Sequence, residues 1–416
     1  MNSGKLFPRG SRKKAKEGYY KWVGRALENG ARVAHKWTTQ TPKAPPLPYA
    51  IEQPDGPTLY QPVLKAEYYR TYWTEYWSKY DNQMGSIREG IKESLSQGND
   101  LDPITVDDID RGVKGFKNNT ALGMDQWNVP WLKAMSLEAK EGLAAILNMV
   151  EGCRAWPTHT MSNTIVLMGK PQGGCRPIAL MPMLYRLWTK VRKPQIQQWD
   201  KTTCRGPWDA AIQGSSALRA AILTMFQDEL HLLNGGEVAS ILWDMEKFYD
   251  SLDICKLIDR ANYLGYPSKL IAMGMTMHMA PRVIRAYEHH MEVGLPANGI
   301  IAGCTQSNHF ARIFLYTVIL ALGEGSPYGE IRTFVDDIAQ TERGKETYPL
   351  FTSKDLIVLH TVRRAKILIR ELRESNLVIS EKTVVLANRK STVSYTHLRA
   401  HETREDRVCR GLGEKK

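Results

Sequence analysis

The stretch that decides the fold reads Ile241-Leu242-Trp243-Asp244-Met245-Glu246-Lys247-Phe248-Tyr249-Asp250. A second stretch has the same form and reads Ile331-Arg332-Thr333-Phe334-Val335-Asp336-Asp337-Ile338-Ala339. Each begins as an apolar run of strand length and ends on carboxylates, and in the second the two Asp residues fall where a hairpin turn is expected. If the strands lie side by side, Asp244, Asp336 and Asp337 form one cluster. Because carboxylates held that close repel each other unless a cation neutralises them, the pattern predicts a two-metal phosphoryl-transfer site that binds Mg²⁺.

A simpler reading of the Asp-Asp pair is an ordinary turn or helix start. The chain contains such a case in Asp107-Asp108, which follows Thr105 as a helix N-terminus. The Phe334–Asp337 motif alone therefore does not decide between a turn and a metal site.

Composition limits the class of protein. The chain has 416 residues with 43% hydrophobic content, which is enough for two or three subdomains with their own cores. Its 56 Lys and Arg against 44 Asp and Glu give a formal charge of +12, which favours polyanionic partners such as nucleic acid. The six Cys lack C-x-x-C spacing, so a reducing compartment fits better than a disulfide framework or a thiolate zinc site. Without a signal-peptide core or a run long enough to span a membrane, the sequence predicts a soluble intracellular protein.

Residues 1–100 are expected to be an N-terminal linker or adaptor region. Residues 43–48 are rich in Pro and should be extended, because Pro blocks helix and biases its neighbours toward polyproline II. The aromatic-rich run at 68–77 predicts a helix whose rings either stack on bases or pack on the next domain, and their helical spacing favours packing.

A strand expected at 163–168 runs into a Gly-rich loop that carries Lys170 and Arg176. Two cations and free backbone N–H groups in one loop suit a triphosphate, although a surface hairpin with incidental cations has the same pattern. Further along, a Gly-punctuated loop opens a helix at about 307, and Gly303 there would let a ligand approach the backbone closely. Other helices are expected at about 105–116, 136–150, 183–199, 210–230, 254–280, 307–322 and 353–374, and other strands at 282–287 and 291–293.

Taken in order, the motifs resemble those of one family, the reverse transcriptases of non-LTR retrotransposons and group II introns, over roughly residues 105–390. The matching segments are Gly123-Met124-Asp125, Arg176-Pro177-Ile178-Ala179-Leu180, Asp244–Asp250, Gly303-Cys304 with Ser307, and Phe334–Asp337. The chain departs from the family at Ala302, where Gln is usual, and at Phe334, where Tyr is commoner. Ser380-Glu381-Lys382 is an altered form of the last motif.

The resemblance implies an α+β fold, a right-hand polymerase with fingers over 101–185 and a palm over 186–391, in which helices back an antiparallel palm sheet and the thumb is missing. It implies an RNA-directed DNA polymerase that joins dNTPs to a DNA primer on an RNA template with two Mg²⁺ ions, Mn²⁺ being the alternative. The protein would then be nuclear if it comes from a eukaryotic retroelement. Two other readings stay open: a catalytically degenerate scaffold or maturase that binds nucleic acid, and an RNA-dependent RNA polymerase.

The resemblance also assigns roles to residues. Asp244 and Asp336 would be the principal metal ligands, with Asp337 ligating or orienting and the backbone of Met245 touching the second metal. Lys170 and Arg176 would neutralise the β- and γ-phosphates. Tyr249 would sit under the sugar and exclude a ribose 2′-hydroxyl. Lys382 would either protonate the departing pyrophosphate or be a solvated Lys at a strand end.

The end of the sequence calls for a different explanation. Residues 392–403 can be back-translated into a sequence that resembles a transposase-type sequencing adapter, so 392–416 is interpreted as an adapter-derived tail and not as a domain. The spacing of His397, His401 and Cys409 is therefore given no weight as a zinc site. On this interpretation the natural reading frame continued beyond Ser391 into a thumb, and an endonuclease could have preceded the N-terminus.

Overall fold

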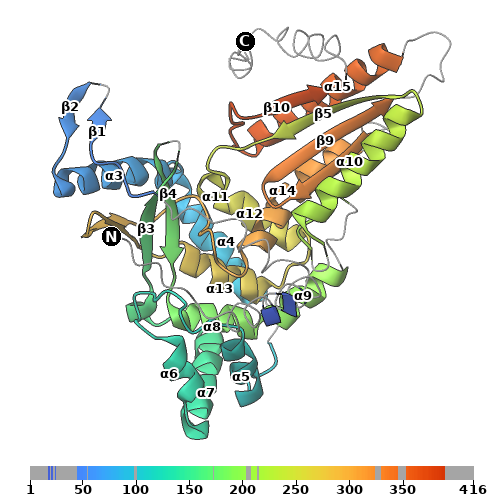
Figure 1. Ribbon diagram of the computed structural model, residues 1–416. Helices are drawn as coiled ribbons and strands as arrows, with labels where there is room; N and C mark the ends of the chain where they lie inside the picture. Colours follow the sequence, from blue (N-terminus) through green and yellow to red (C-terminus); the bar gives the residue numbers. More distant parts are fainter. Residues whose placement is uncertain are drawn as a thin grey trace. The chain divides into compact units, whose positions relative to one another are not determined.

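The computed structural model describes residues 45–53, 55–97, 101–171, 173–202, 208–212, 215–323, 329–344 and 353–388, together with residues 17, 18, 20, 21 and 24. Helices and strands both build this part of the chain, so the fold is of mixed α+β type, as expected (Figure 1). The expected adapter-derived tail at 392–416, with its His and Cys spacing, lies outside the described residues.

The chain divides into two compact units. The first comprises Met1–Tyr49 and Met168–Arg176, and the second comprises Ala50–Leu167 and Pro177–Lys416. In the first unit a Cβ on Gly169 would lie 2.4 Å from the carbonyl oxygen of Pro46, so the Pro-rich stretch runs close to this segment. The predicted boundaries after residues 100 and 185 both fall inside the second unit, and the assignment of fingers and palm stays a prediction.

The first of two four-stranded sheets in the described residues has the strand order β10-β5-β9-β8. Its strands are β5 (Glu237–Trp243), β8 (Gly329–Phe334), β9 (Asp337–Gly344) and β10 (Val384–Ala387). All neighbouring pairs are antiparallel, and β5 pairs with β9 so that Trp243 lies opposite Ile338. Both of these side chains are buried. The helices α14 (Ser307–Gly323) and α15 (Ser353–Glu374) pack on this sheet, and α10 (Ala217–Leu233) contacts β5.

The second sheet of the described chain has the order β4-β3-β6-β7. Its strands are β3 (Asn163–Gly169), β4 (Cys175–Leu180), β6 (Arg282–Ala286) and β7 (His289–Gly294). The strands β3 and β6 are parallel, and β6 and β7 form an antiparallel hairpin. A short ribbon of β1 (Ile51–Gln53) and β2 (Gly56–Leu59) stands apart from both sheets.

The second unit contains further helices, most of which contribute to one apolar core together with β5, β9, α14 and α15. They are α3 (Pro62–Trp77), α4 (Met84–Gln97), α5 (Val106–Lys114), α6 (Val129–Ala134), α7 (Leu137–Cys153), α8 (Met183–Val191), α9 (Lys193–Thr202), α11 (Phe248–Ser251), α12 (Ile254–Tyr263) and α13 (Ser268–His278). The helix α13 is buried along most of its length, and α4 and α12 pack against it. Thr105 starts α5 with a capping box, in which its hydroxyl accepts from Asp108 N–H and the Asp108 carboxylate accepts from Thr105 N–H.

The expectation of a linker over residues 1–100 is wrong for residues 62–97. Over this stretch the chain forms α3 and α4, and Trp73, Trp77 and Ile87 are buried in the second unit. The helix α3 packs on β6 and β7, which are more than 200 residues away in the chain. Two alternatives were open for the aromatic run at 68–77. Its Trp residues pack in the interior and do not form an exposed stacking surface.

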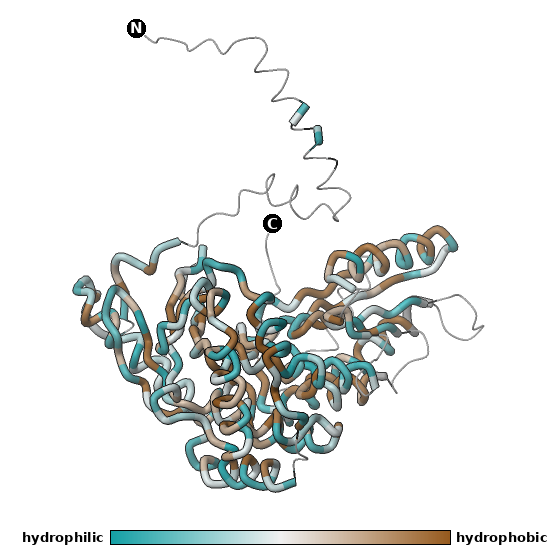
Figure 2. Tube along the Cα trace, turned by 90° about the horizontal axis from the view of Figure 1, so that it is seen from below, coloured by the Kyte–Doolittle hydropathy of each residue, from teal (hydrophilic) through white to brown (hydrophobic). Residues whose placement is uncertain are grey.

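Most of the other predicted elements are confirmed, with ends that shift by a few residues. The predicted strand at 163–168 is β3, and the helices predicted at 105–116, 136–150 and 353–374 are α5, α7 and α15. The short helix α6 was not predicted. The strand β4, the neighbour of β3 in its sheet, agrees with the hairpin that was the alternative reading of the Lys170 loop. None of the described helices combines the length and the apolar character of a membrane span, and Figure 2 shows apolar and polar stretches alternating along the tube.

Candidate functional site

Two of the three predicted carboxylates come together where β5 ends and β9 begins. Asp244 directly follows β5, and Asp337 is the first residue of β9. Because Trp243 pairs with Ile338, the same register brings Asp244 opposite Asp337. Desolvation beside the sheet and the negative charge of Asp244 raise the pKa of the Asp337 carboxyl. The two strands thus lie side by side as predicted, and two carboxylates repel each other there.

Asp336 occupies the hairpin turn between β8 and β9. The turn places Val335 at φ +64°, a left-handed conformation that β-branched residues rarely adopt. Asp336 is half-buried and lies near Tyr249. Burial of Tyr249 is the main cause that raises the pKa of its hydroxyl, and the negative charge of Asp336 raises this pKa further. Asp336 and Tyr249 therefore border the same region as Asp244 and Asp337.

The carboxylates provide some of the oxygen ligands that a hard divalent cation requires. Among the residues that the structure describes, no group of three or more His, Cys, Asp or Glu side chains is arranged to hold a metal ion. Mg²⁺, however, is usually held by one or two carboxylates and by substrate phosphates rather than by a complete protein cage. A repelling pair such as Asp244 and Asp337 has the chemistry for that kind of site, and the assignment of metal ligands stays a prediction.

The backbone of Met245 is held in a defined orientation beside this pair. The carbonyl of Asp244 accepts from Ser380 N–H at 2.8 Å, and Glu246 N–H donates to Val378 O at 2.9 Å. Met245 and Ile379 are thus a pair in an antiparallel bridge that exchanges no hydrogen bond, so the N–H and C=O of Met245 point away from Ile379. Because 378–380 runs on the β10 side of β5, they point toward the β9 side, where Asp337 lies.

Tyr249 is held by a partner that the sequence did not indicate. Its hydroxyl donates to the side-chain oxygen of Asn308 at 3.0 Å, and the ring is half-buried. Asn308 stands in the first turn of α14, just after the Gly303 loop. This hydrogen bond fixes the position of the Tyr249 ring relative to the start of that helix.

Gly303 lies at φ +95°, and a Cβ built on it would meet no atom within 4 Å. Only glycine adopts this conformation without strain, and the space beside it is open. The loop before it is anchored by His278, whose Nδ1 accepts from Ile301 N–H at 2.8 Å, and by Arg282, which donates to Gly299 O at 2.8 Å. Burial and the charge of Arg282 lower the pKa of His278 to about 3, so the imidazole is neutral and can accept this bond.

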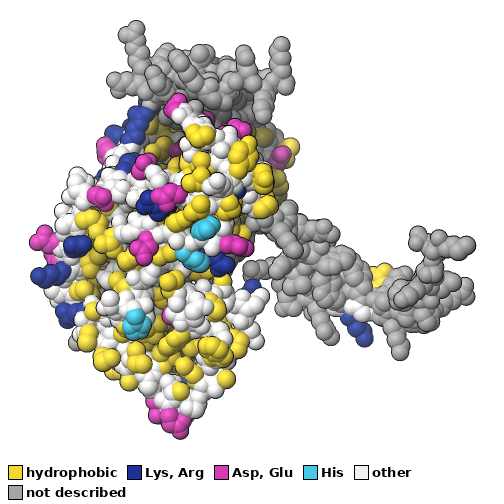
Figure 3. All heavy atoms as spheres, turned by 90° about the vertical axis from the view of Figure 1, so that its left-hand side faces the viewer, with side chains coloured by type: hydrophobic (Ala, Val, Ile, Leu, Met, Phe, Trp, Pro, Cys, Tyr) yellow, Lys and Arg dark blue, Asp and Glu magenta, His cyan; other side chains and the backbone are white. Residues whose placement is uncertain are grey.

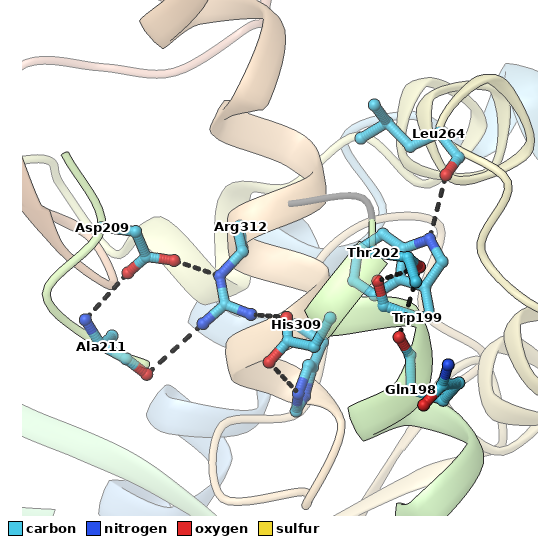
Figure 4. A network of polar contacts seen from close by, with 9 residues as sticks. Gln198, Trp199, Thr202, Asp209, Ala211, Leu264, His309 and Arg312 are labelled. Carbon is cyan, nitrogen blue, oxygen red and sulfur yellow. Dashed lines mark hydrogen bonds and ion pairs between the residues drawn. The ribbon is translucent and has the colours of Figure 1, made fainter. Parts of the chain in front are cut away.

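The helix that follows the Gly303 loop is tied to the strand that leads to Asp336. Figure 4 shows the Arg312 guanidinium of α14 between the carboxylate of Asp209 and the carbonyl of Ala211. Arg312 also pairs with Asp200 of α9. The segment of Asp209 in turn bridges to β8, because Ala210 N–H donates to Thr333 O at 2.8 Å and Thr333 N–H donates to Trp208 O at 2.8 Å. A buried charged cluster thus connects both sides of the candidate site.

The roles of the other predicted residues stay predictions. Lys170 and Arg176 belong to the first unit, so their contact with phosphates stays a prediction. Lys382 is exposed at the end of the 378–382 segment, and both of its proposed roles remain open. Asp125 has a structural position, because its carboxylate accepts from Leu184 N–H at 3.0 Å in the first turn of α8.

Sequence reasoning missed Asn308, His278, Arg282 and Asp209. His278 is the last residue of the apolar, Met-rich helix α13, and Arg282 is the first residue of β6; both are buried. Asn308 and Asp209 stand in no motif, and only the folded chain brings them to their partners.

Comparison of the sequence with protein-family models yields no match. A comparison with curated proteins likewise yields none.

Proposed function

We propose that this protein is an RNA-directed DNA polymerase, which extends a DNA primer on an RNA template with dNTPs. The observation that carries the proposal is the antiparallel pairing of β5 with β9, which sets Asp244 opposite Asp337 while Asp336 lies near Tyr249. Two acidic strand ends of this kind are what the resemblance of the sequence motifs to reverse transcriptases requires of a palm.

Asp244 and Asp336 would hold two Mg²⁺ ions, with Asp337 ligating or orienting and the carbonyl of Met245 as a further oxygen ligand. When bound, the metal ions supply a lowered pKa for the primer 3′-hydroxyl and charge neutralisation for the triphosphate. The protein's own part is to hold the carboxylates in place, and the hydrogen bonds from Ser380 and Glu246 around Asp244 support that role. Mn²⁺ would fit the same oxygen ligands.

Tyr249 would select the sugar. Its ring is fixed by the hydrogen bond to Asn308, so a nucleotide bound over the carboxylates would meet a rigid aromatic surface at the position of its 2′-carbon. A ribose 2′-hydroxyl would clash with that ring, which favours dNTPs over NTPs. The open space beside Gly303 would let the nucleotide or its template base approach the backbone.

Lys170 and Arg176 would hold the β- and γ-phosphates, and Lys382 would give a proton to the departing pyrophosphate. The formal charge of +12 suits an RNA template and a DNA primer as partners. On the face drawn in Figure 3, Lys and Arg side chains stand next to Asp and Glu side chains, so the positive charge is not gathered into one patch there.

Primer extension on an RNA template with Mg²⁺ tests the proposal directly. Wild type is expected to add dNTPs, and Asp336→Asn is expected to lower the rate by roughly 10³-fold, because loss of a metal ligand removes several kcal/mol of transition-state stabilisation. Asp107→Asn, at an exposed Asp of the other Asp-Asp pair, is the matched control and should retain full activity.

The other outcomes of this experiment are equally specific. An Asp336→Asn variant as active as wild type would overturn the two-metal assignment. Preference for NTPs would identify an RNA-dependent RNA polymerase. Tight RNA binding with no incorporation by wild type would identify a nucleic-acid-binding scaffold or maturase, which Ala302 in place of the usual Gln would suit.

A further inference from the structure

The turn that carries Tyr249 cannot hold its own shape. The helix α11 is four residues long, and an isolated helix of that length is unstable in water. Lys247, which precedes it, has φ +42°, a left-handed conformation that costs energy in a residue with a side chain. The position of Tyr249 must therefore be set by neighbouring elements.

The helix α3 makes several side-chain contacts with this turn, among them one of Lys247 with the Tyr72 ring. The hydroxyls of Tyr76 and Ser251 hydrogen-bond at 2.7 Å, and Trp77 Nε1–H donates to the Asp250 carboxylate at 3.0 Å. The Lys247 ammonium lies 4.8 Å from the centroid of the Tyr76 ring, which is within the range of a cation–π interaction. These contacts reach the turn on both sides of Tyr249.

The aromatic end of α3 is itself rigidly held. Trp73 and Trp77 are each 1% exposed, and their rings stack with centroids 4.8 Å apart. The buried guanidinium of Arg282 lies 4.4 Å from the Trp77 ring centroid. A helix anchored in this way can set the position of the four-residue helix α11.

The same end of α3 also contacts the loop that leads to Gly303. Ala297 N–H donates to Trp77 O at 2.7 Å, and the Asn298 amide donates to Tyr76 O at 3.1 Å and to Asp250 O at 2.9 Å. Ile300 N–H donates to Tyr249 O at 2.8 Å. The turn of Tyr249 thus lies between α3 and this loop. The C-terminal end of α3 contacts both and fixes their positions.

We propose that Tyr76 and Trp77 of α3 are positioning residues that fix the Tyr249 turn and thereby set the discrimination between dNTPs and NTPs. This inference rests on the proposed polymerase function. It adds that sugar selectivity depends on a helix that precedes every motif of the family resemblance. Neither residue contacts the nucleotide in this scheme, since both act through Ser251 and Asp250.

The test compares Tyr76→Phe and Trp77→Phe with wild type in the full chain. Tyr76→Phe keeps the ring over Lys247 and removes only the hydroxyl, and Trp77→Phe removes the N–H that reaches Asp250. Each is expected to lower the dNTP over NTP ratio of kcat/KM by about threefold to tenfold, because each removes one hydrogen bond to the turn. The change should appear as a lower KM for NTPs, with kcat for dNTPs nearly unchanged.

Tyr68→Phe is the matched control, because it removes a hydroxyl from the same helix about two turns before Tyr76, and it should leave the ratio unchanged. Hydrogen exchange at the amides of Asp250, Ser251 and Ile300 gives a readout that needs no activity, and it should speed up in both test variants. Unchanged exchange overturns the positioning role, and faster exchange with an unchanged ratio overturns its link to selectivity. If wild type incorporates no nucleotide, the polymerase proposal fails by itself, and exchange alone then decides whether α3 holds the turn.

Discussion

The buried imidazole of His278 shows how a single residue makes this fold depend on pH. In the folded chain its pKa is about 3, against 6.5 for an ordinary His, because burial disfavours the charged ring. Between these two values the unfolded chain binds a proton that the folded chain does not bind. The free energy of unfolding therefore falls as the pH drops below about 6.5, and the fall continues toward pH 3.

His278→Asn should remove this pH dependence, because Asn keeps an acceptor near the Nδ1 position that accepts from Ile301 N–H and does not titrate. Wild type is expected to lose roughly 2 kcal/mol more than the variant between pH 7 and about pH 5. Urea unfolding at the two pH values measures the difference, which is independent of the cavity that the smaller side chain leaves.

His159→Asn provides the comparison, because His159 is exposed and its replacement should leave the pH dependence as in wild type. A His278→Asn variant that loses stability toward pH 5 as steeply as wild type would show that this imidazole is not buried in its neutral form.

Among single residues, the sequence could identify those whose neighbours carry a signal. Asp244, Asp336 and Asp337 end apolar runs, and Gly303 stands in a loop rich in Gly, so local pattern was enough to select them. Asn308 and His278 act through partners 59 and 23 residues away, and no local pattern reveals such contacts.

At the scale of elements, a helix that packs its rings was predicted within α3, but the region around it was assigned to a linker. Its aromatic rings recur so often that the helix has no clear polar face, and it follows a Pro-rich stretch, so the region was taken for a linker. The helix packs on β6, β7 and α11, which lie far along the chain. Lys65 is buried with them, and its ammonium lies 4.1 Å from the Tyr287 ring centroid.

Trp73→Ala should destabilise the protein by about 3–5 kcal/mol, because the change leaves a cavity where a fully buried Trp was packed. If the residue belonged to an exposed linker, the same change would leave the free energy of unfolding unaltered. Tyr60→Ala is the matched control. Tyr60 lies just before α3, its side chain is 59% exposed, and its replacement should change the stability little. Chemical denaturation of both variants gives the two free energies, and equal values would contradict the packed position of α3.

At the scale of the whole molecule, the excess of positive charge should govern affinity for nucleic acid. If about four phosphates are neutralised on binding, the affinity for an RNA–DNA duplex should fall roughly 10²-fold between about 50 and about 200 mM salt, because counterions are released. Fluorescence anisotropy at several salt concentrations measures the slope. A peptide nucleic acid of the same sequence, which has no phosphates, should show no such slope, and equal slopes for both would rule out phosphate contacts as the basis of binding.

The sequence by itself predicted most of the main helices and strands, because apolar periodicity, caps and turn residues act within a few positions of one another. The α+β class came from the resemblance of its motifs to those of reverse transcriptases. It also determined that acidic residues end two apolar strands. Only the tertiary structure decided that these strands pair with Asp244 opposite Asp337, and that α3 packs against the Tyr249 turn instead of serving as a linker. The physical reason is range: strand pairing and the burial of aromatic rings join residues more than 90 positions apart, and the favourable free energy of those contacts exists only once the chain has folded.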